Sequence, residues 1–143
     1  MPTKPSAGAV FAHPVRVYWE DTDAGGIVFY ANYLKFFERA RTEWLRSLGI
    51  EQRVLRDTTG GMFVVSQTDL RYLAPARLDD VLQITAKSSE IGRSSMVIVQ
   101  EALLISEQPT RCLCRGSIRI GWVHAASLRP ARMPPVLLDA LHP

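Results

Sequence analysis

Two carboxylates, Asp21 and Asp23, stand two positions apart and are followed at once by the glycine pair Gly25 and Gly26. An apolar run comes next, so a carboxylate here would lie beside a dry interior, where its charge acts more strongly than in water. The longest helical pattern of the chain then begins, which would turn free backbone N–H groups and the positive end of the helix dipole toward the loop. This setting suits acyl chemistry, although the same residues could also form a plain turn between a strand and a helix.

Other chemistries that use closely spaced aspartates fit this stretch poorly. A calcium loop that begins at Asp21 needs an oxygen side chain at its fifth position and a glutamate at its twelfth, whereas the chain has Gly25 and Asn32 there. A haloacid-dehalogenase-type phosphatase requires alternating strands and helices, which this sequence lacks. The sequence contains no nucleophile-elbow, phosphate-loop or dinucleotide-binding motif, and its three histidines lie far apart. We therefore expect neither a metal nor a cofactor.

The elements that would hold the loop can be predicted from the periodicity on either side. Residues 13–20 alternate between apolar and polar side chains, which predicts a half-buried strand. From about Tyr30 onward, apolar residues recur at steps of three and four, which predicts a long helix. Arg41 falls near the middle of its apolar stripe, where we expect it to be ion-paired or to extend toward solvent. Gly49 stands where a left-handed C-cap residue belongs.

The second half of the chain has the pattern of β-structure throughout. Strands are predicted over residues 62–73, 81–91, 96–105 and 111–123, with turn residues between them. The short connections favour antiparallel neighbours. One antiparallel sheet has an apolar face that must be covered, and the long helix is the obvious cover, which gives an α+β fold. A single helix leaves part of this sheet exposed, so we expect a homodimer or a homotetramer.

The bulk composition indicates one globular domain. The 143 residues carry a formal charge of +3 without a run of like charges, so we expect no nucleic-acid partner. No segment approaches the ~20 apolar residues of a membrane span, and two cysteines are too few for a disulfide framework. These features predict a cytoplasmic protein. We expect residues 1–12 to form a flexible leader, 13–125 the domain and 126–143 a C-terminal tail.

Longer strings of residues resemble a known family. The string from Val15 to Tyr33, which contains Asp-Thr-Asp-Ala-Gly-Gly-Ile-Val, looks like that of the hot-dog-fold acyl-CoA thioesterases. It is most similar to the Tol–Pal-associated (YbgC-type) branch, with 4-hydroxybenzoyl-CoA thioesterases as cousins. The similarity continues through Phe37-Glu-Arg-Ala-Arg-Thr-Glu-Trp-Leu-Arg and Tyr72-Leu-Ala-Pro-Ala-Arg-Leu-Asp-Asp. The family's fold, a long central helix wrapped by a mainly antiparallel five-stranded sheet, agrees with the element order above.

The resemblance implies roles for individual residues. The family's catalytic carboxylate falls on Asp23, and the backbone N–H of Tyr30 becomes the donor to the oxyanion. YbgC-type members usually carry a histidine where this chain has Tyr30, whereas the hydroxybenzoyl-type cousins have tyrosine. Arg93 matches an arginine that contacts the nucleotide phosphate in those cousins. The implied substrate-binding residues are Gly25, Gly26, Ile27, Val28, Arg93 and Ser94.

The implied activity is hydrolysis of an acyl-CoA or acyl-carrier-protein thioester to the free acid and a thiol. Asp23 could attack the carbonyl directly or act as a general base on water, and the sequence leaves both routes open. The alternative function is a non-catalytic module on the same fold that binds acyl-CoA or acyl carrier protein and does not need Asp23. Nothing in the sequence distinguishes short, long and aryl acyl groups.

Overall fold

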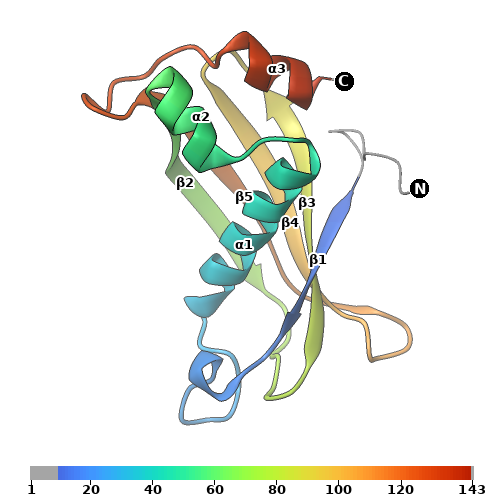
Figure 1. The fold of residues 1–143 in the computed structure, drawn as a ribbon. Coiled ribbons are helices and arrows are strands. Elements are labelled where there is room, and N and C mark those ends of the chain that lie inside the picture. Colours follow the sequence, from blue (N-terminus) through green and yellow to red (C-terminus); the bar gives the residue numbers. More distant parts are fainter. Residues whose placement is uncertain (1–9, 143) are drawn as a thin grey trace.

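The structure is a computed structural model that describes residues 10–142 (Figure 1). Within that range a single long helix lies against one sheet. Shorter helical segments precede and follow the long helix in the sequence, and another comes after the last strand. The elements are β1 (Phe11–Arg16), η1 (Trp19–Asp21), α1 (Asn32–Ser47), α2 (Gln52–Thr59), β2 (Gly61–Tyr72), β3 (Val81–Ile91), β4 (Ser95–Leu104), β5 (Arg111–His124) and α3 (Pro135–Leu141). All the strands predicted for the second half of the chain are present.

The five strands form one antiparallel sheet in the order β1-β3-β4-β5-β2. Short connections join β3, β4 and β5 into consecutive hairpins, as expected for antiparallel neighbours. β1 and β2 are the edge strands, and each pairs on one side only. Pro14 suits the edge strand β1, because proline has no N–H for a second ladder. The predicted α+β hot-dog architecture is confirmed.

Helix α1 lies on one face of the sheet and supplies the largest side chains of the core (Figure 1). Phe37 and Trp44 are 0% exposed and follow the predicted steps of three and four. Phe36, which the predicted stripe did not include, is also 0% exposed. Gly49 has a φ of 85°, which confirms its left-handed position after the helix. The helix packs mainly against β3, β1 and β4. Most side chains along β2, by contrast, are exposed or only partly buried.

A buried polar link ties α1 to the sheet. The Gln100 side chain on β4 is 1% exposed and donates to the Phe37 carbonyl at 3.0 Å and to the Thr85 carbonyl at 3.1 Å. Its Oε1 accepts a hydrogen bond from Arg41 at 3.0 Å. Arg41 thus pairs with an amide inside the core, and burial lowers the pKa of its guanidinium. Because a buried amide without partners is costly, these bonds hold the helix at one position over the sheet.

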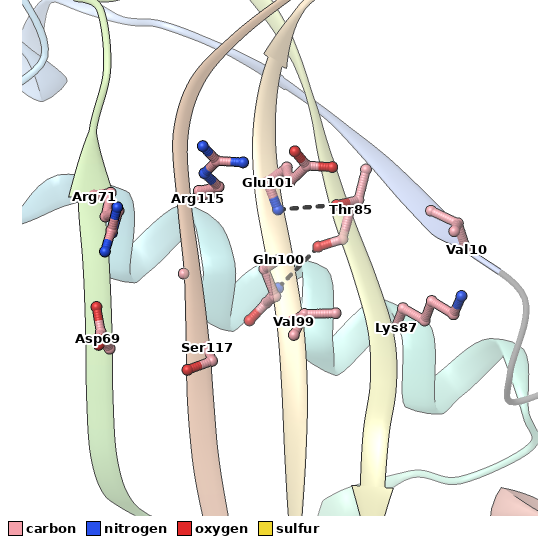
Figure 2. A pocket seen from close by; sticks show the side chains of 11 residues that line it. Val10, Asp69, Arg71, Thr85, Lys87, Val99, Gln100, Glu101, Arg115 and Ser117 are labelled. Carbon is pink, nitrogen blue, oxygen red and sulfur yellow. Dashed lines mark hydrogen bonds between the residues drawn. The ribbon is translucent and has the colours of Figure 1, made fainter.

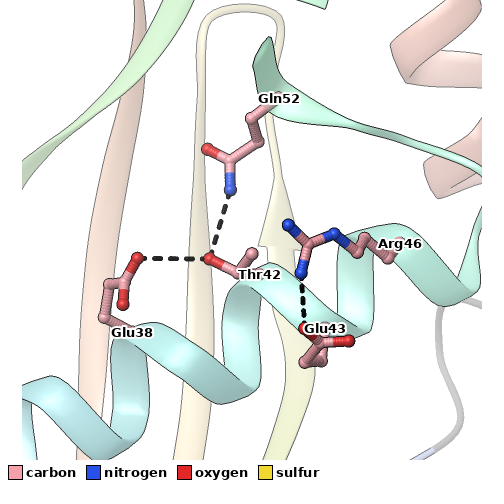
Figure 3. Close-up of polar contacts among 5 residues, drawn as sticks. All are labelled: Glu38, Thr42, Glu43, Arg46 and Gln52. Atoms are coloured by element: carbon pink, nitrogen blue, oxygen red, sulfur yellow. Dashed lines mark hydrogen bonds and ion pairs between the residues drawn. The ribbon is translucent and has the colours of Figure 1, made fainter. Parts of the chain in front are cut away.

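Hydrogen bonds on the solvent side of α1 connect it to α2 (Figure 3). The Thr42 hydroxyl donates to Glu38 at 3.2 Å, and the Gln52 side-chain amide donates to Thr42 at 3.4 Å. An ion pair between Arg46 and Glu43 lies on the same helix. Glu38 is therefore a surface hydrogen-bond acceptor of the helix, in a region separate from the Asp23 loop.

The C-terminal residues pack against the same core. Leu137 and Leu141 of α3 are 0% and 1% exposed, and Met133 just before the helix is 2% exposed. The Met133 N–H donates to the Arg93 carbonyl at 2.8 Å, which attaches this segment to the β3–β4 turn. The expected leader, residues 1–12, lies mostly outside the described residues.

The first strand ends earlier than its alternating pattern predicts. β1 stops at Arg16, and Trp19, which the alternation assigns to the strand, begins η1 with 81% exposure. The chain bends here because the Asp21 carboxylate accepts the Tyr18 N–H at 2.8 Å, a local bond that competes with the strand ladder. The long helix also begins slightly later than predicted, with Ala31 as its N-cap residue.

Candidate active site

Asp23 lies on a tight turn between η1 and α1. Its carbonyl accepts the Gly26 N–H at 3.0 Å, and its own N–H donates to the Ile27 carbonyl at 2.9 Å. Gly26 has a φ of 80°, a left-handed conformation that glycine adopts without strain. The Asp23 Oδ1 accepts the Gly25 N–H at 2.8 Å, whereas its Oδ2 has no hydrogen-bond partner among residues 10–142. The glycine pair therefore orients an exposed carboxylate with one oxygen left free.

Asp21, two residues earlier, is buried and serves the loop itself. It is 8% exposed, and its Oδ2 accepts the Tyr18 N–H at 2.8 Å. Its carbonyl accepts the Phe29 N–H at 2.9 Å and the Asn32 side-chain amide at 2.8 Å. Asp21 thus joins the end of β1 to the start of α1 and closes the base of the loop that carries Asp23.

Replacing Asp21 by alanine is expected to destabilise the fold by about 1–3 kcal/mol, because the Tyr18 N–H would lose its acceptor in a partly buried place. Urea unfolding of Asp21→Ala would measure the loss. Thr22→Ala is the matched control, since it removes only an exposed hydrogen bond to the Trp19 carbonyl. Equal unfolding free energies for the two variants would contradict this role of Asp21.

The backbone before α1 keeps donors available near the turn. α1 has no side-chain N-cap bond and no acidic residue in its first turn, so the chain itself does not neutralise the positive end of its dipole. The Tyr30 N–H has no acceptor within the described range 10–142. The Tyr30 carbonyl, by contrast, accepts the Tyr72 hydroxyl at 3.1 Å. This bond from β2 holds the peptide that follows Tyr30. The peptide that carries the Tyr30 N–H is held by its other end, because the Phe29 carbonyl accepts the Asn32 N–H at 2.8 Å.

An apolar groove of about 360 Å³ adjoins the loop. The Tyr72 ring lies 6.2 Å from the Tyr30 ring and 5.8 Å from the Tyr33 ring, measured between centroids. Burial raises the pKa of Tyr33 to about 12, so its hydroxyl stays neutral. The Val28 N–H donates to the Ala76 carbonyl at 2.9 Å, which joins the loop to the segment after β2. The groove is lined by Ile27, Val28, Tyr30, Tyr33, Tyr72, Leu73, Ala74 and Pro75.

Tyr72 and the segment after it belong to this site, and sequence reasoning did not assign them a role. The string beginning Tyr72-Leu-Ala-Pro was the available signal, because it is one of the stretches that carry the family resemblance. The role of Tyr72 follows from the fold, in which β2 places the Tyr72 hydroxyl within hydrogen-bond distance of the Tyr30 carbonyl. A contact between residues so far apart in the sequence cannot be predicted from the Tyr30 string or the Tyr72 string alone.

Arg93 and Ser94 lie at the opposite end of the sheet from Asp23 (Figure 1). They form the turn between β3 and β4, where the Gly92 N–H donates to the Ser95 carbonyl at 2.8 Å. At about 3.3 Å per residue, β3 alone spans roughly 33 Å. A single chain therefore brings together the predicted site residues of the Asp23 loop. Arg93 and Ser94, which were also predicted for the site, lie far from that loop in the same chain.

A match to a family model decides the class of the protein. Residues 17–141 match the model of the thioesterase-like superfamily. The chain belongs to this superfamily. Almost the whole described structure, from η1 through α3, lies inside the matched range.

Relatives of this thioesterase-like chain carry closely related names. The acyl-CoA thioesterase YbgC of Haemophilus influenzae is 37% identical over 132 residues, which cover 92% of this chain and 94% of the relative. The acyl-CoA thioester hydrolase YbgC of Escherichia coli is 43% identical over 116 residues, which cover 78% of this chain and 86% of the relative. The resemblance to the YbgC-type branch is confirmed.

Solved structures agree with the thioesterase-like fold. A probable thioesterase from Bartonella henselae has a TM-score of 0.79 at 30% identity, covering 88% of this chain and 100% of that chain. A 4-hydroxybenzoyl CoA thioesterase mutant complexed with 4-hydroxybenzoyl CoA has a TM-score of 0.85 at 19% identity, covering 92% and 98%. At that lower identity the likeness concerns the fold.

Among residues 10–142 no group of three or more His, Cys, Asp or Glu side chains is placed to hold a metal ion. None of the helices in that range is both long and apolar enough to cross a membrane. The candidate reactive groups near the groove are the Asp23 carboxylate and the backbone donors before α1.

Proposed function

We infer that the protein hydrolyses acyl-CoA thioesters to a free acid and CoA, with Asp23 as the reacting carboxylate. The family match and the two YbgC relatives make the protein a thioester hydrolase. The observation that carries the residue assignment is the turn that leaves Asp23 Oδ2 free on the same loop as the unpaired Tyr30 N–H. The apolar groove beside that loop offers a place for the acyl group.

Two routes through Asp23 are chemically balanced. In the first, Oδ2 attacks the thioester carbonyl, the carbon–sulfur bond breaks, and CoA thiolate leaves an acyl–aspartyl anhydride that water then hydrolyses. In the second, Asp23 takes a proton from a water molecule that attacks the carbonyl directly. A thioester carbonyl is electrophilic and its thiolate leaves readily, so neither route needs a full catalytic triad.

The backbone before α1 stabilises the oxyanion in this proposal. Negative charge develops on the carbonyl oxygen in both routes, and a fixed N–H donor aimed at it lowers the barrier. The Tyr30 N–H meets this need, because the Phe29 carbonyl of the same peptide accepts the Asn32 N–H at 2.8 Å and the helix dipole adds positive potential. Gly25 and Gly26 let the backbone approach the thioester closely.

Tyr30→Phe is expected to keep kcat close to the native value, because the proposal assigns the backbone N–H, and not the phenol, to the oxyanion. The Tyr72 hydroxyl still has the Tyr30 carbonyl as its acceptor in this variant. Steady-state release of CoA thiol would measure the effect. A fall of about 100-fold or more would give the phenolic hydroxyl a part in the chemistry.

A second copy of the chain completes the site in this proposal. α1 packs mainly against β3, β1 and β4, so Phe63, Val65 and Tyr72 of β2 stay exposed or half-buried. β2 is also an edge strand with unpaired backbone groups along one side, which is a template for pairing with another strand. Antiparallel pairing of β2 with β2 of a second copy would cover these side chains.

The same pairing gives Arg93 and Ser94 a place in substrate binding. Two antiparallel β2 strands put the Gly61 end of one copy beside the Tyr72 end of the other. The β3–β4 turn of the second copy then moves toward the Asp23 loop of the first. In this arrangement Arg93 would contact a phosphate of CoA, because a guanidinium suits phosphate recognition.

A substrate panel tests the proposed function. Short, long and aryl acyl-CoAs, together with acyl carrier protein thioesters, would be compared by the rate of thiol release. Hydrolysis of at least one acyl-CoA is the expected result, and the preferred acyl group reports the shape of the groove. Binding of acyl-CoA without hydrolysis of any member would favour the alternative, a non-catalytic binding module.

The cytoplasm is the proposed location of the enzyme. Cys112 and Cys114 are free thiols, which fits a reducing compartment. Burial raises the pKa of Cys114 to about 12, so this thiol is an inert core side chain. An association with the Tol–Pal system remains a prediction that rests on the branch resemblance.

A further inference from the structure

The segment between β5 and α3, residues 125–134, lies at the end of the sheet that holds the β3–β4 turn (Figure 1). The Ala131 N–H donates to the Trp122 carbonyl at 2.9 Å. Two residues later, the Met133 N–H donates to the Arg93 carbonyl of the turn at 2.8 Å. Met133 is 2% exposed, so its side chain anchors the segment in the core. The backbone around residue 132 therefore has a fixed position beside the turn.

Arg132 extends from this backbone next to Arg93. The Met133 N–H belongs to the peptide that follows Arg132, and the carbonyl that accepts it belongs to the peptide that follows Arg93. Backbones joined by such a bond place neighbouring Cα atoms roughly 5 Å apart. Both arginine side chains are exposed. Two long and flexible guanidinium side chains can therefore reach the same small volume of solvent.

Neither arginine of this pair is neutralised by the chain. Among residues 10–142, no carboxylate lies within 4.0 Å of the Arg93 or Arg132 guanidinium. Glu90, three residues before Arg93, pairs instead with Arg119 at 3.7 Å. Asp139 is the one side-chain carboxylate that follows β5, and it forms no ion pair within the same range. Like charges held close together repel each other, a cost that a bound anion would remove.

Arginines on the face of the sheet turned away from α1 have a different setting. There Arg71 and Arg115 line a hollow of about 470 Å³ together with Asp69 and Glu101 (Figure 2). An anion attracted by these two arginines would be repelled by the two carboxylates. That hollow is therefore a poorer place for an anion than the β3–β4 turn.

We propose that Arg132 is a second phosphate-binding residue for CoA and binds together with Arg93 of the same chain. The inference rests on the function proposed above, in which Arg93 contacts a phosphate of CoA. CoA carries a diphosphate and a 3′-phosphate, so a single guanidinium leaves most of its charge without a partner. A guanidinium binds phosphate through two parallel N–H···O bonds. Two arginines on adjacent backbones can bind neighbouring phosphate oxygens.

The position of Arg132 also fits the proposed site built from two copies. The turn itself offers one cation, because Arg93 stands between Gly92 and Ser94. The second cation comes from the C-terminal segment, which a backbone bond attaches to that turn. Since both arginines belong to one chain, a second copy would bring both of them toward the Asp23 loop of the first copy.

Arg132→Ala is expected to weaken the binding of CoA about 10-fold, because a charge-assisted hydrogen bond is lost while the turn is unchanged. Calorimetric titration with CoA measures this loss without any turnover. In steady-state assays, KM for an acyl-CoA should rise by a similar factor, and kcat should stay close to the native value. KM for the matching acyl-pantetheine, which has the thioester but no nucleotide phosphates, should not change. A merely structural role of Arg132 would affect both substrates.

Two further variants serve as controls. Arg39→Ala removes an exposed arginine of α1 that likewise forms no ion pair among residues 10–142, so it should bind CoA with native affinity. Arg132→Lys keeps the charge but loses the paired N–H donors, so its affinity should lie between those of the native protein and Arg132→Ala. Circular dichroism would confirm that each variant is folded.

The outcomes separate this inference from the proposed hydrolysis. Acyl-CoA turnover with native CoA affinity in Arg132→Ala would overturn the role of Arg132 and keep the proposed function. Weaker CoA binding in Arg132→Ala, in a protein that hydrolyses no thioester, would keep the role of Arg132 and overturn the proposed function. An equal rise in KM for acyl-pantetheine, or no measurable binding of CoA by the native protein, would also overturn the inference.

Discussion

Asp23→Asn is expected to lower kcat for acyl-CoA hydrolysis by about 10²- to 10⁴-fold, the range for loss of a group that handles the reacting proton. Asparagine has the same shape, and its Oδ1 can still accept the Gly25 N–H that now holds Asp23 at 2.8 Å. The turn should therefore survive. The amide has no negative charge, so it can neither attack the carbonyl nor deprotonate water. KM should change much less than kcat, because the groove and the backbone are untouched.

The measurement is thiol release under steady-state conditions, with Asp57→Asn on α2 as a control for removal of one surface carboxylate. Thermal unfolding should be alike in the two variants, because the Asp23 side chain is exposed. Native rates in Asp23→Asn would remove Asp23 from the chemistry. That result would still leave the family assignment intact, since it rests on the match over residues 17–141.

The second large effect concerns the core. Phe36→Ala is expected to lower the free energy of unfolding by about 3–5 kcal/mol, because a fully buried ring would leave a cavity that the surrounding helix and sheet can fill only in part. Phe36 is 0% exposed, and its ring lies 5.9 Å from that of Tyr33, which lines the groove. The substitution should therefore also weaken the packing of Tyr33, which lines the groove.

Urea unfolding at one fixed protein concentration would measure this loss, since association also contributes to apparent stability. Lys35→Ala is the matched control, because it truncates the exposed neighbour of Phe36 on the same helix. A loss in Phe36→Ala no larger than that in Lys35→Ala would mean that the ring does not support the core.

Local patterns were sufficient for most elements of this fold. β3 is found at Val81–Ile91, the predicted range, because turn residues bound a run with clear β-propensity. α1 follows its apolar stripe, and Gly49 ends it as predicted. The stripe also placed Arg41 among apolar neighbours, but it could not reveal that Gln100, far away in the sequence, would receive that side chain.

The misses have a common physical cause, which is contact between residues distant in sequence or competition from a side chain. Alternation continued the first strand through Trp19, whereas the Asp21 carboxylate bends the chain there. Arg93 belongs to the family pattern, yet strand length puts it at the far end of the sheet from Asp23 within one copy, so its proposed role depends on a second copy that the sequence does not place. Tyr72 reaches the site only through the register of β2 and β5. Periodicity carries no information on any of these pairings.

The different burial of Asp21 and Asp23 has a consequence for how this chain can vary over time. A library of variants screened only for folding would retain Asp21, whose carboxylate and carbonyl hold the ends of the loop together. The same screen would let position 23 drift, because its exposed side chain contributes little to the fold. A screen for activity would retain both. Identical residues two positions apart are thus under separate kinds of selection, one for the shape of the loop and one for its use.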